Sequence, residues 1–387
     1  MTQHVSPLSA AHQPCPAAWY SAAAAARPFY FDAELAVWVA ASAATVAAVL
    51  HSPLCGVRPA GQPLPAALQG RALGALFSRL LRQRDGPAHL AGKAALLQAL
   101  AALSHVELDG AAHSAIAACQ PLLRQGSAAA VDAMCLQLPL HLVATLLGMP
   151  AQAGAAARAQ LGSLLAGLAT TASEAQIAAA ETALAALLAI TRPPPPVATP
   201  LWRALAAAWP DAEWRAANLL ALLQQTHDAS AALLANALYR LAQAPRLRRQ
   251  LRVAPRGLPA FIAESQRLDA AVQHSWRFVQ QDGELCGQPV TAGQRVLVLL
   301  AAANLDPACH AEPLAFRLQR GRREHGFGAG AHRCPGSRIA LAACHALLQH
   351  CLRRRMPWRQ LAASQQFHPP ANVRWRHFDA LEKGDTA

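Results

Sequence analysis

The chain has 387 residues, 54% of them hydrophobic, which is enough for a sizeable core in one domain or two. Its nine cysteines show no disulfide-framework spacing, which argues against a disulfide-rich secreted protein and favours a reducing compartment. The net charge of +13 is compatible with a nucleic-acid partner, but the arginines are spread along the chain without a recognition motif, so we expect no such partner.

The N-terminal part predicts little regular structure before residue 29. The first thirty residues are rich in Ala and Pro and lack the basic-then-apolar pattern of a signal peptide. Residues 29–40 alternate aromatic and polar side chains, which predicts a short hairpin, and residues 43–50 predict a helix. The apolar stretch 36–50 is too short to span a membrane. We therefore expect a cytoplasmic protein without a membrane anchor.

Most of the remaining predicted elements are helices, because Ala and Leu dominate the apolar residues. Residues 51–70 contain Pro and Gly and predict a loop, and helical periodicity then covers residues 71–84, 89–103, 131–147 and 174–190. Gly148-Met149-Pro150 is a helix-stop signal, and prolines 193–196 predict a stiff exposed linker. The helices on both sides of the linker share one composition, so we expect a single domain over residues 1–387.

Residues 213–240 predict the longest helix, and its middle carries the polar cluster Gln224-Gln225-Thr226-His227-Asp228-Ala229-Ser230. Polar groups in a buried helix cost free energy unless they are hydrogen-bonded or line a wet cavity. A solvated helix face is the simpler reading, but the apolar turns on both sides favour a chemical role. Beyond residue 281, short strand-like pieces, including residues 295–300, predict a small sheet.

The most informative motif is Phe327-Gly328-Ala329-Gly330-Ala331-His332-Arg333-Cys334-Pro335-Gly336, directly before a predicted helix over residues 337–348. Unpaired N–H groups at the helix start stabilise negative charge on the Cys334 sulfur. Gly328 and Gly330 permit backbone conformations that a Cβ disfavours, and leave room for a large flat ligand. A Phe-x-x-Gly-x-x-x-Cys-x-Gly loop suits a haem iron with a proximal thiolate ligand.

Three other interpretations of this loop have weaker support. A nucleotide-binding loop needs glycine where Arg333 stands. A zinc site needs paired cysteine spacing, which Cys334, Cys344 and His345 lack. A buried free cysteine at a helix start is the remaining alternative.

The loop resembles the cysteine-ligand loop of the cytochrome P450 superfamily in its bacterial form, with His two residues before Cys. Five further segments resemble the family in its usual order. They are Asp85-Gly86-Pro87-Ala88-His89 with Lys93, residues 131–150, the long helix around Asp228, the pair in Glu264-Ser265-Gln266-Arg267, and the connection to the loop formed by Val272-Gln273, Arg277 and residues 303–307. The resemblance implies a mainly α fold, the triangular helical prism with a small β-rich region, and haem b ligated by Cys334.

The resemblance also implies which residues bind the haem: Cys334, His89, Lys93, Arg277, His332, Phe327, Gly328 and Gly336. Lys93 stands where arginine is more common, which keeps the charge but loses the bidentate fork. For His89 and Lys93 an ordinary solvated helix face remains the alternative. Glu264 and Arg267 are implied to form a buried structural pair. Its third partner is Arg317 or Arg320, since Ala315 stands where the family has arginine.

The polar cluster departs from the family at one position. In the family an acid followed by threonine supports proton delivery, whereas here Asp228 is followed by Ala229. Ser230, Thr226 or a hydroxyl of the substrate would have to replace the missing group. The catalytic candidates are therefore Asp228, Ser230 and Thr226.

The resemblance places the substrate pocket between the long helix and the segment before Arg277. We expect it to be lined by Ala221, Gln224, Gln225, Ala229, Gln273, His274 and Ser275, with residues 53–70 and 165–175 as its roof. The polar groups favour a substrate with hydrogen-bonding groups. His274 is either a distal ligand or acid, or a satisfied pocket histidine.

The function implied by the resemblance is a haem-thiolate monooxygenase that oxidises, most simply by hydroxylation, a small polar natural product, free or carrier-bound. Electrons would come from a separate ferredoxin or flavodoxin with its reductase. Arginines near the loop would suit an acidic donor, or form a solvated basic surface: Arg317, Arg320, Arg322, Arg323 and Arg338. The alternatives are atypical haem-thiolate chemistry (peroxide-driven oxidation, isomerisation or dehydration) and a non-catalytic haem or ligand-binding protein.

Overall fold

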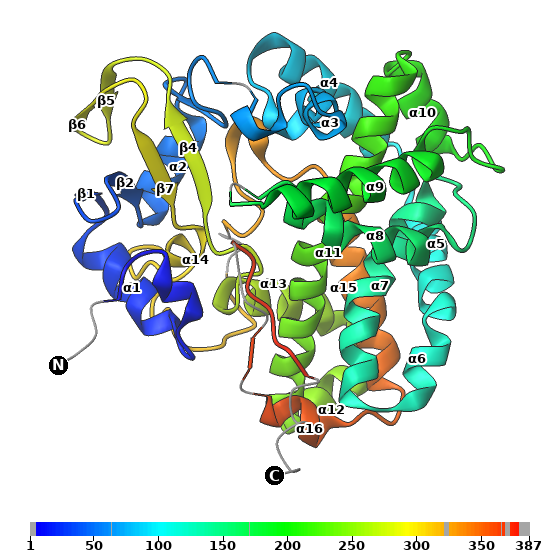
Figure 1. Cartoon of the computed structure of the whole chain (residues 1–387). Helices are drawn as coiled ribbons and strands as arrows, with labels where there is room; N and C mark the ends of the chain where they lie inside the picture. Colours follow the sequence, from blue (N-terminus) through cyan, green and yellow to red (C-terminus); the bar gives the residue numbers. More distant parts are fainter. Residues whose placement is uncertain are drawn as a thin grey trace.

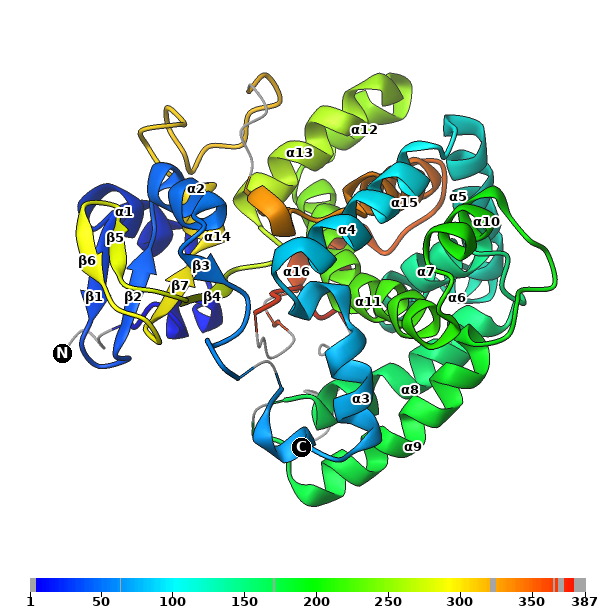
Figure 2. The same cartoon turned by 90° about the horizontal axis from the view of Figure 1, so that it is seen from above.

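A computed structural model describes residues 5–62, 64–169, 171–320, 325–364, 366–367 and 372–378. Figures 1 and 2 show a β-rich part with α1, α2 and α14 on one side of the molecule and most helices on the other. The prediction of a mainly helical fold with a small β region is confirmed.

The β-rich part joins segments that are far apart in the sequence. The predicted hairpin is confirmed as β1 (Phe29–Asp32) and β2 (Val37–Ala40). It extends into a five-stranded sheet, β1-β2-β7-β4-β3, in which β2 and β7 are parallel. The added strands are β7 (Arg295–Val298), β4 (Ser275–Val279) and β3 (Cys55–Gly56), while β5 (Gly283–Leu285) and β6 (Gln288–Val290) form a separate pair.

The prediction that the first thirty residues are irregular is wrong. A 3-10 turn, η1 (Ser9–His12), precedes the ten-residue helix α1 (Ala17–Ala26). A run of five alanines has the highest intrinsic helix propensity, and the helix buries Tyr20 and Ala24. α1 packs against the short helix α14 (Leu300–Ala303), and this tertiary contact supports the N-terminal helix.

The helix expected over residues 71–84 is split in two. α3 (Ala72–Arg79) ends at Leu80, which is extended, and the 3-10 turn η3 (Leu81–Gln83) follows. Asn218, buried in α11 (Ala212–Gln243), explains the break: its side chain accepts a hydrogen bond from the Leu81 N–H (2.8 Å) and donates one to the Arg79 carbonyl (3.0 Å). The side-chain amide of Asn218 thus replaces the backbone hydrogen bonds of the helix at this point.

The other predicted helices are confirmed within a few residues: α2 (Ala43–His51), α4 (Gly86–Ala101), α7 (Ala128–Leu146), α9 (Glu174–Thr191), α11 and α15 (Ser337–Leu352). Further helices are α5 (His105–Ala118), α6 (Gln120–Gln125), α8 (Ala153–Gly167), α10 (Pro200–Ala208), α12 (Pro245–Val253), α13 (Leu258–Leu268) and α16 (Trp358–Ala363). α11 packs against α7 and α15 in the middle of the helical part (Figure 1).

Two helices, α7 and α9, are long and apolar enough to cross a membrane by length and composition, with 72% and 33% of their apolar windows buried in the protein. A core helix of a soluble protein meets the same criterion, so this is weak evidence for a membrane span.

Candidate functional site

The Cys334 loop has a defined backbone. The Cys334 N–H donates to the Phe327 carbonyl (2.9 Å), and Gly328 and Gly330 both adopt left-handed conformations, with φ of +67° and +65°. α15 then starts at Ser337. Burial raises the pKa of the Cys334 thiol, while the Gly336 N–H and the cations Lys93 and Arg82 oppose this rise. Such a sulfur is best held as thiolate by a bound metal ion.

Two residues of α4 tie this helix to the loop. His89 is buried, with Nδ1 2.9 Å from the Leu81 carbonyl and Nε2 3.2 Å from the Ala331 carbonyl. Lys93 Nζ donates to the Arg333 carbonyl at 2.6 Å. His89 and Lys93 thus contact the Cys334 loop, and both do so through backbone carbonyl groups.

His332 and Asp85 form the polar edge of the same region. The His332 ring stacks on that of His89, with centroids 4.0 Å apart, and its Nε2 lies 2.9 Å from Asp85 Oδ1. The other Asp85 oxygen accepts the Val57 N–H at 2.8 Å. Although burial opposes it, these hydrogen bonds hold the pKa of Asp85 below its usual value. Burial lowers the pKa of His332, against the effect of Asp85.

Arg277 is a buried cation whose charge is poorly compensated. Among the described residues it donates only to Ser275 Oγ (3.0 Å) and the Trp276 carbonyl (2.8 Å), and it has no ion pair there. Burial lowers its pKa, and Asp85 only partly opposes this. Buried guanidinium groups need an anion. The residues near Cys334 thus fit a ligand with a metal that binds sulfur and carboxylates that bind cations, which is the chemistry of haem.

Glu264 on α13 holds the segment that leads to the loop. It accepts from Arg267 Nε and Nη2 (both 2.8 Å), from the Arg317 backbone N–H (2.8 Å) and from Arg320 Nε (3.1 Å). The third member of the pair is therefore the Arg320 side chain, because the Arg317 side chain pairs with Glu312. Arg267 also donates to the carbonyls of Asn304, Pro313 and Ala315, so the group is structural.

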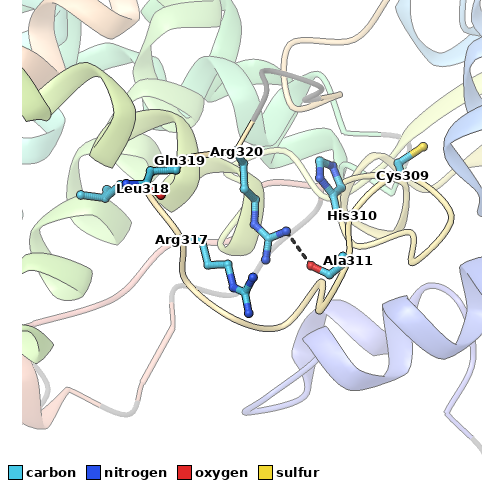
Figure 3. Close-up of a pocket in the computed structure, with 7 residues that line it drawn as sticks. All are labelled: Cys309, His310, Ala311, Arg317, Leu318, Gln319 and Arg320. Atoms are coloured by element: carbon cyan, nitrogen blue, oxygen red, sulfur yellow. Dashed lines mark hydrogen bonds between the residues drawn. The ribbon is translucent and has the colours of Figure 1, made fainter.

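A pocket of about 740 Å³ lies beside Arg320, outside the predicted site. Figure 3 shows Arg320 reaching across it to the Ala311 carbonyl (2.7 Å). Its lining contains none of the predicted haem or substrate residues: Cys309, His310, Ala311, Arg317, Leu318, Gln319 and Arg320.

The polar cluster of α11 interrupts a buried helix, as the sequence suggested. Residues 224–229 all keep accessible surface, whereas residues 216–221 and 230–238 are buried. The Thr226 hydroxyl donates to the Leu222 carbonyl one turn back (2.6 Å) and is thus engaged within its own helix. Asp228 is half-exposed and pairs with His227 Nδ1 at 2.6 Å. Ser230 Oγ makes no hydrogen bond with any residue that the structure describes.

The residues before Arg277 divide between two faces. Ser275 and Arg277 share one face of β4 and bond to each other. His274 lies on the other face, where its ring meets Trp276 edge-on at 6.3 Å, and burial together with nearby His12 lowers its pKa to about 4. Strand alternation thus puts His274 away from Arg277. The Gln273 amide nitrogen donates to the Ala270 carbonyl, and its buried oxygen has no hydrogen-bond partner among the described residues.

The site also includes a residue that the sequence did not single out. Arg82, in η3, interacts electrostatically with the Cys334 thiol and with Arg277. In the sequence it stands among Arg84, Asp85 and Gln83, where a charged run is indistinguishable from a solvated helix face.

Part of the chain matches a known protein family and its curated members. The family model Cytochrome P450 matches residues 257–355, from α13 through α15. Cytochrome P450 144 of Mycobacterium tuberculosis is 36% identical over 129 residues, 33% of this chain and 30% of that protein. The 20-oxo-5-O-mycaminosyltylactone 23-monooxygenase of Streptomyces fradiae is 36% identical over 124 residues, 32% and 30% of the two chains. These matches span less than a third of the relatives' length.

Solved structures match over nearly the whole chain. P450BioI, crystallised with hexadec-9Z-enoic acid ligated acyl carrier protein, has a TM-score of 0.79 at 21% identity and covers 93% of this chain and 96% of its own. CalO2 has a TM-score of 0.80 at 23% identity and covers 93% and 94%. At 21% and 23% identity, these matches show that the chain has the fold of these two structures. Residues 257–355 thus match the cytochrome P450 family, whose members are haem-thiolate enzymes that hold haem b through a cysteine-ligated iron.

Proposed function

We propose that this protein is a cytochrome P450 monooxygenase that binds haem b through Cys334 and oxidises a small substrate with hydrogen-bonding groups. The observation that carries the proposal is the Cys334 loop, fixed at the start of α15, with the cations Lys93 and Arg277 that form no ion pair with any described residue. When bound, haem supplies the activation of dioxygen and the oxidation itself.

The chain's own residues would hold and orient this cofactor. Arg277 and His332 are the candidate propionate ligands, since a buried guanidinium favours carboxylates and the His332 ring already bonds the Asp85 carboxylate. His89 and Lys93 keep the loop against α4 through its backbone carbonyls. Phe327, Gly328 and Gly336 shape the loop around the sulfur, and the Gly336 N–H acts to lower the pKa of the Cys334 thiol.

Proton supply would pass along α11. Asp228 is half-exposed and can exchange protons with water. Ser230 is the better replacement for the hydroxyl missing at Ala229, because its Oγ bonds no described residue, while that of Thr226 already donates to the Leu222 carbonyl. We expect Ser230→Ala to raise the ratio of peroxide released to product formed, and Thr226→Ala to change it less. A larger effect of Thr226→Ala would contradict this order.

Gln224 and Gln225 from α11, with Gln273 and Ser275 before Arg277, supply hydrogen-bonding groups for a polar substrate, and Ala221 and Ala229 supply apolar surface. In the roof proposed over residues 53–70 and 165–175, residues 63 and 170 lie outside the described ranges. P450BioI was crystallised with an acyl group carried by a carrier protein, which supports testing carrier-bound substrates as well as free ones.

Electrons would come from a ferredoxin or flavodoxin in the cytoplasm. The chain's basic balance and the arginines at the loop, Arg338 among them, suit an acidic donor. Arg322 and Arg323, which also belong to the predicted docking face, lie outside the described residues.

The first test replaces Cys334 with alanine. We expect the reduced, carbon monoxide-bound protein to lose the red-shifted Soret band of a thiolate ligand. Cys309→Ala is the matched control, because Cys309 is also partly buried but belongs to the separate pocket. Retention of the band in Cys334→Ala would refute the ligand assignment.

Atypical chemistry is the second candidate, and Ala229 favours it, because the position lacks the hydroxyl that supports proton delivery in the family. Turnover with peroxide equal to turnover with a reconstituted electron chain would support this candidate. Strict dependence on the electron chain would exclude it.

A further inference from the structure

A strongly basic surface lies at one end of the molecule. Two short segments, residues 246–256 and 353–359, hold nine arginines and no acidic residue. The first segment comprises most of α12 and part of the turn η4 (Pro255–Gly257), and the second runs from the end of α15 into α16. Eight of the nine arginines are exposed. We call the surface of these two segments the arginine patch.

The fold brings the two segments together, although they are far apart in the sequence. The Arg248 guanidinium lies over the Trp358 ring, 4.7 Å from its centroid, which joins α12 to α16. α12 also packs against α15. The Gln243 side-chain amide at the end of α11 donates to the Ala362 carbonyl of α16 at 2.7 Å. Figure 1 shows α12 and α16 side by side at the lower end of the molecule, so the charges of both segments belong to one surface.

The protein does not neutralise this surface with its own described residues. None of the eight exposed arginines forms an ion pair or a side-chain hydrogen bond with any residue that the structure describes. Elsewhere an exposed arginine does pair, as Arg192 does with Glu213 at 2.9 Å. Like charges that gather on one face repel one another and create a positive potential in front of it. An approaching anionic surface relieves this repulsion, so the arginine patch favours an anionic partner.

The helix α15 separates the arginine patch from the Cys334 loop. Cys334 stands just before this helix, and Arg353 stands just after it. A helix of 16 residues is about 24 Å long at a rise of ~1.5 Å per residue. The arginine patch is therefore a different surface from the arginines at the loop, which we assign to the electron donor.

Apolar side chains among the arginines indicate which anionic partner fits. Val253 is 83% exposed and lies between Arg252 and Arg256 in the sequence. Met356 and Trp358 are partly exposed in the second segment. Arginines that surround exposed aliphatic and tryptophan side chains are typical of surfaces that bind at the headgroup level of a bilayer. Basic clusters of this size attract anionic lipids without a shaped groove, because every arginine near the surface adds to the attraction.

We propose that the arginine patch docks the protein on the surface of a bilayer that contains anionic lipids, with Val253 in the headgroup region. The association is peripheral, because charge and an aliphatic contact carry it rather than a membrane-spanning helix. It goes beyond the proposed function and does not depend on it, since no residue of the arginine patch belongs to the candidate haem or substrate site.

The test measures binding of the purified holoprotein to sedimented vesicles. The vesicles contain phosphatidylcholine alone or an equal mixture with phosphatidylglycerol. We expect binding to the mixed vesicles only, and its loss at high salt, which screens the charges. The triple variant Arg249→Gln, Arg252→Gln and Arg354→Gln should bind the mixed vesicles about a hundredfold more weakly.

A matched triple variant controls for net charge. It carries Arg27→Gln, Arg203→Gln and Arg295→Gln, which remove the same number of charges from exposed positions outside the arginine patch. We expect it to bind the mixed vesicles nearly as well as the unaltered protein. The vesicles therefore report the position of the charges and not only their number.

Val253→Ser separates a bilayer from a soluble polyanion. Loss of a partly buried aliphatic contact should weaken binding to the mixed vesicles about three- to tenfold. The soluble probes are poly-L-glutamate and a short DNA duplex, and Val253→Ser should not change the binding of either. Because Val253 is 83% exposed in the protein, the substitution should leave the urea unfolding curve unchanged.

Three results would overturn the proposal. The first is that the holoprotein does not bind the mixed vesicles at low salt. The second is equal weakening in the two triple variants, which would attribute binding to net charge alone. The third is unchanged vesicle binding in Val253→Ser together with tighter binding of poly-L-glutamate or DNA through the same arginines, which would reassign the arginine patch to an acidic protein or a nucleic acid.

Discussion

Gly330→Ala should disrupt the cysteine loop far more than Gly328→Ala, although the two glycines have nearly the same backbone. Both are left-handed, with φ of +65° and +67°, so alanine costs about 1–2 kcal/mol at either position. They differ in their surroundings. A Cβ at Gly330 would lie 2.1 Å from the Leu50 carbonyl oxygen at the end of α2, whereas one at Gly328 has nothing within 4 Å.

The additional cost at Gly330 follows from that distance. A carbon atom in contact with a carbonyl oxygen lies roughly 3.3 Å away or more, so the loop would have to move by about 1 Å. Overpacking of this kind costs about 1–3 kcal/mol. The total for Gly330→Ala is then about 2–5 kcal/mol, a large share of the ~5–15 kcal/mol of a typical protein. The shift would also move Cys334, which lies four residues further on.

The assay measures unfolding in urea by far-UV circular dichroism, together with haem bound per protein and the Soret band of the thiolate complex. Gly328→Ala should retain haem and lose about 1–2 kcal/mol. Gly330→Ala should lose most of its haem. Equal stability and haem content in the two variants would refute the reasoning, because only the contact with Leu50 distinguishes them.

The remaining predictions concern buried carboxylates. Glu264→Gln removes the charge between Arg267 and Arg320 and should cost about 3–5 kcal/mol in urea unfolding, whereas exposed Glu174→Gln should cost less than about 1 kcal/mol. Burial alone would raise the pKa of Glu264, but the hydrogen bonds from Arg267 and the Arg317 N–H hold it below its usual value. Its stabilisation is therefore complete above the unfolded pKa of about 4.3 and is lost as the pH falls through the folded pKa; a pH series should show a weaker acid dependence in Glu264→Gln. Asp306→Ala leaves the Ala43 N–H at the start of α2 unpaired (2.8 Å in the structure) and should cost about 1–2 kcal/mol in thermal melts, with no loss expected from Asp109→Ala, whose exposed carboxylate makes no hydrogen bond with any described residue.

Several features of the site could be read from local sequence because they depend on spacing along the chain. The Cys334 loop, the pair Glu264 and Arg267 and the polar cluster of α11 each lie within a few residues of one another. Glycine content, helical periodicity and a polar interruption of an apolar helix are properties of such short segments. The long helices were predictable for the same reason.

Other features depend on partners that are distant in the sequence. Asn218 ends a helix more than a hundred residues earlier, and only this break gives Arg82 its position. Strand alternation separates His274 from Arg277 once β4 is paired in the sheet. The choice of Arg320 over the Arg317 side chain as the partner of Glu264 likewise depends on how the segment folds back.

By itself the sequence determined which chemical groups are available. These are a cysteine at a helix start, cations spaced along one helix and one strand, and a long helix with a polar middle. The tertiary structure decided which of these groups are already engaged. Thr226, His89 and Lys93 hold backbone carbonyls, while Ser230 and Arg82 have no partner among the described residues. The physical reason is that hydrogen-bond capacity is set by residue type, but its satisfaction is set by neighbours that only folding brings together.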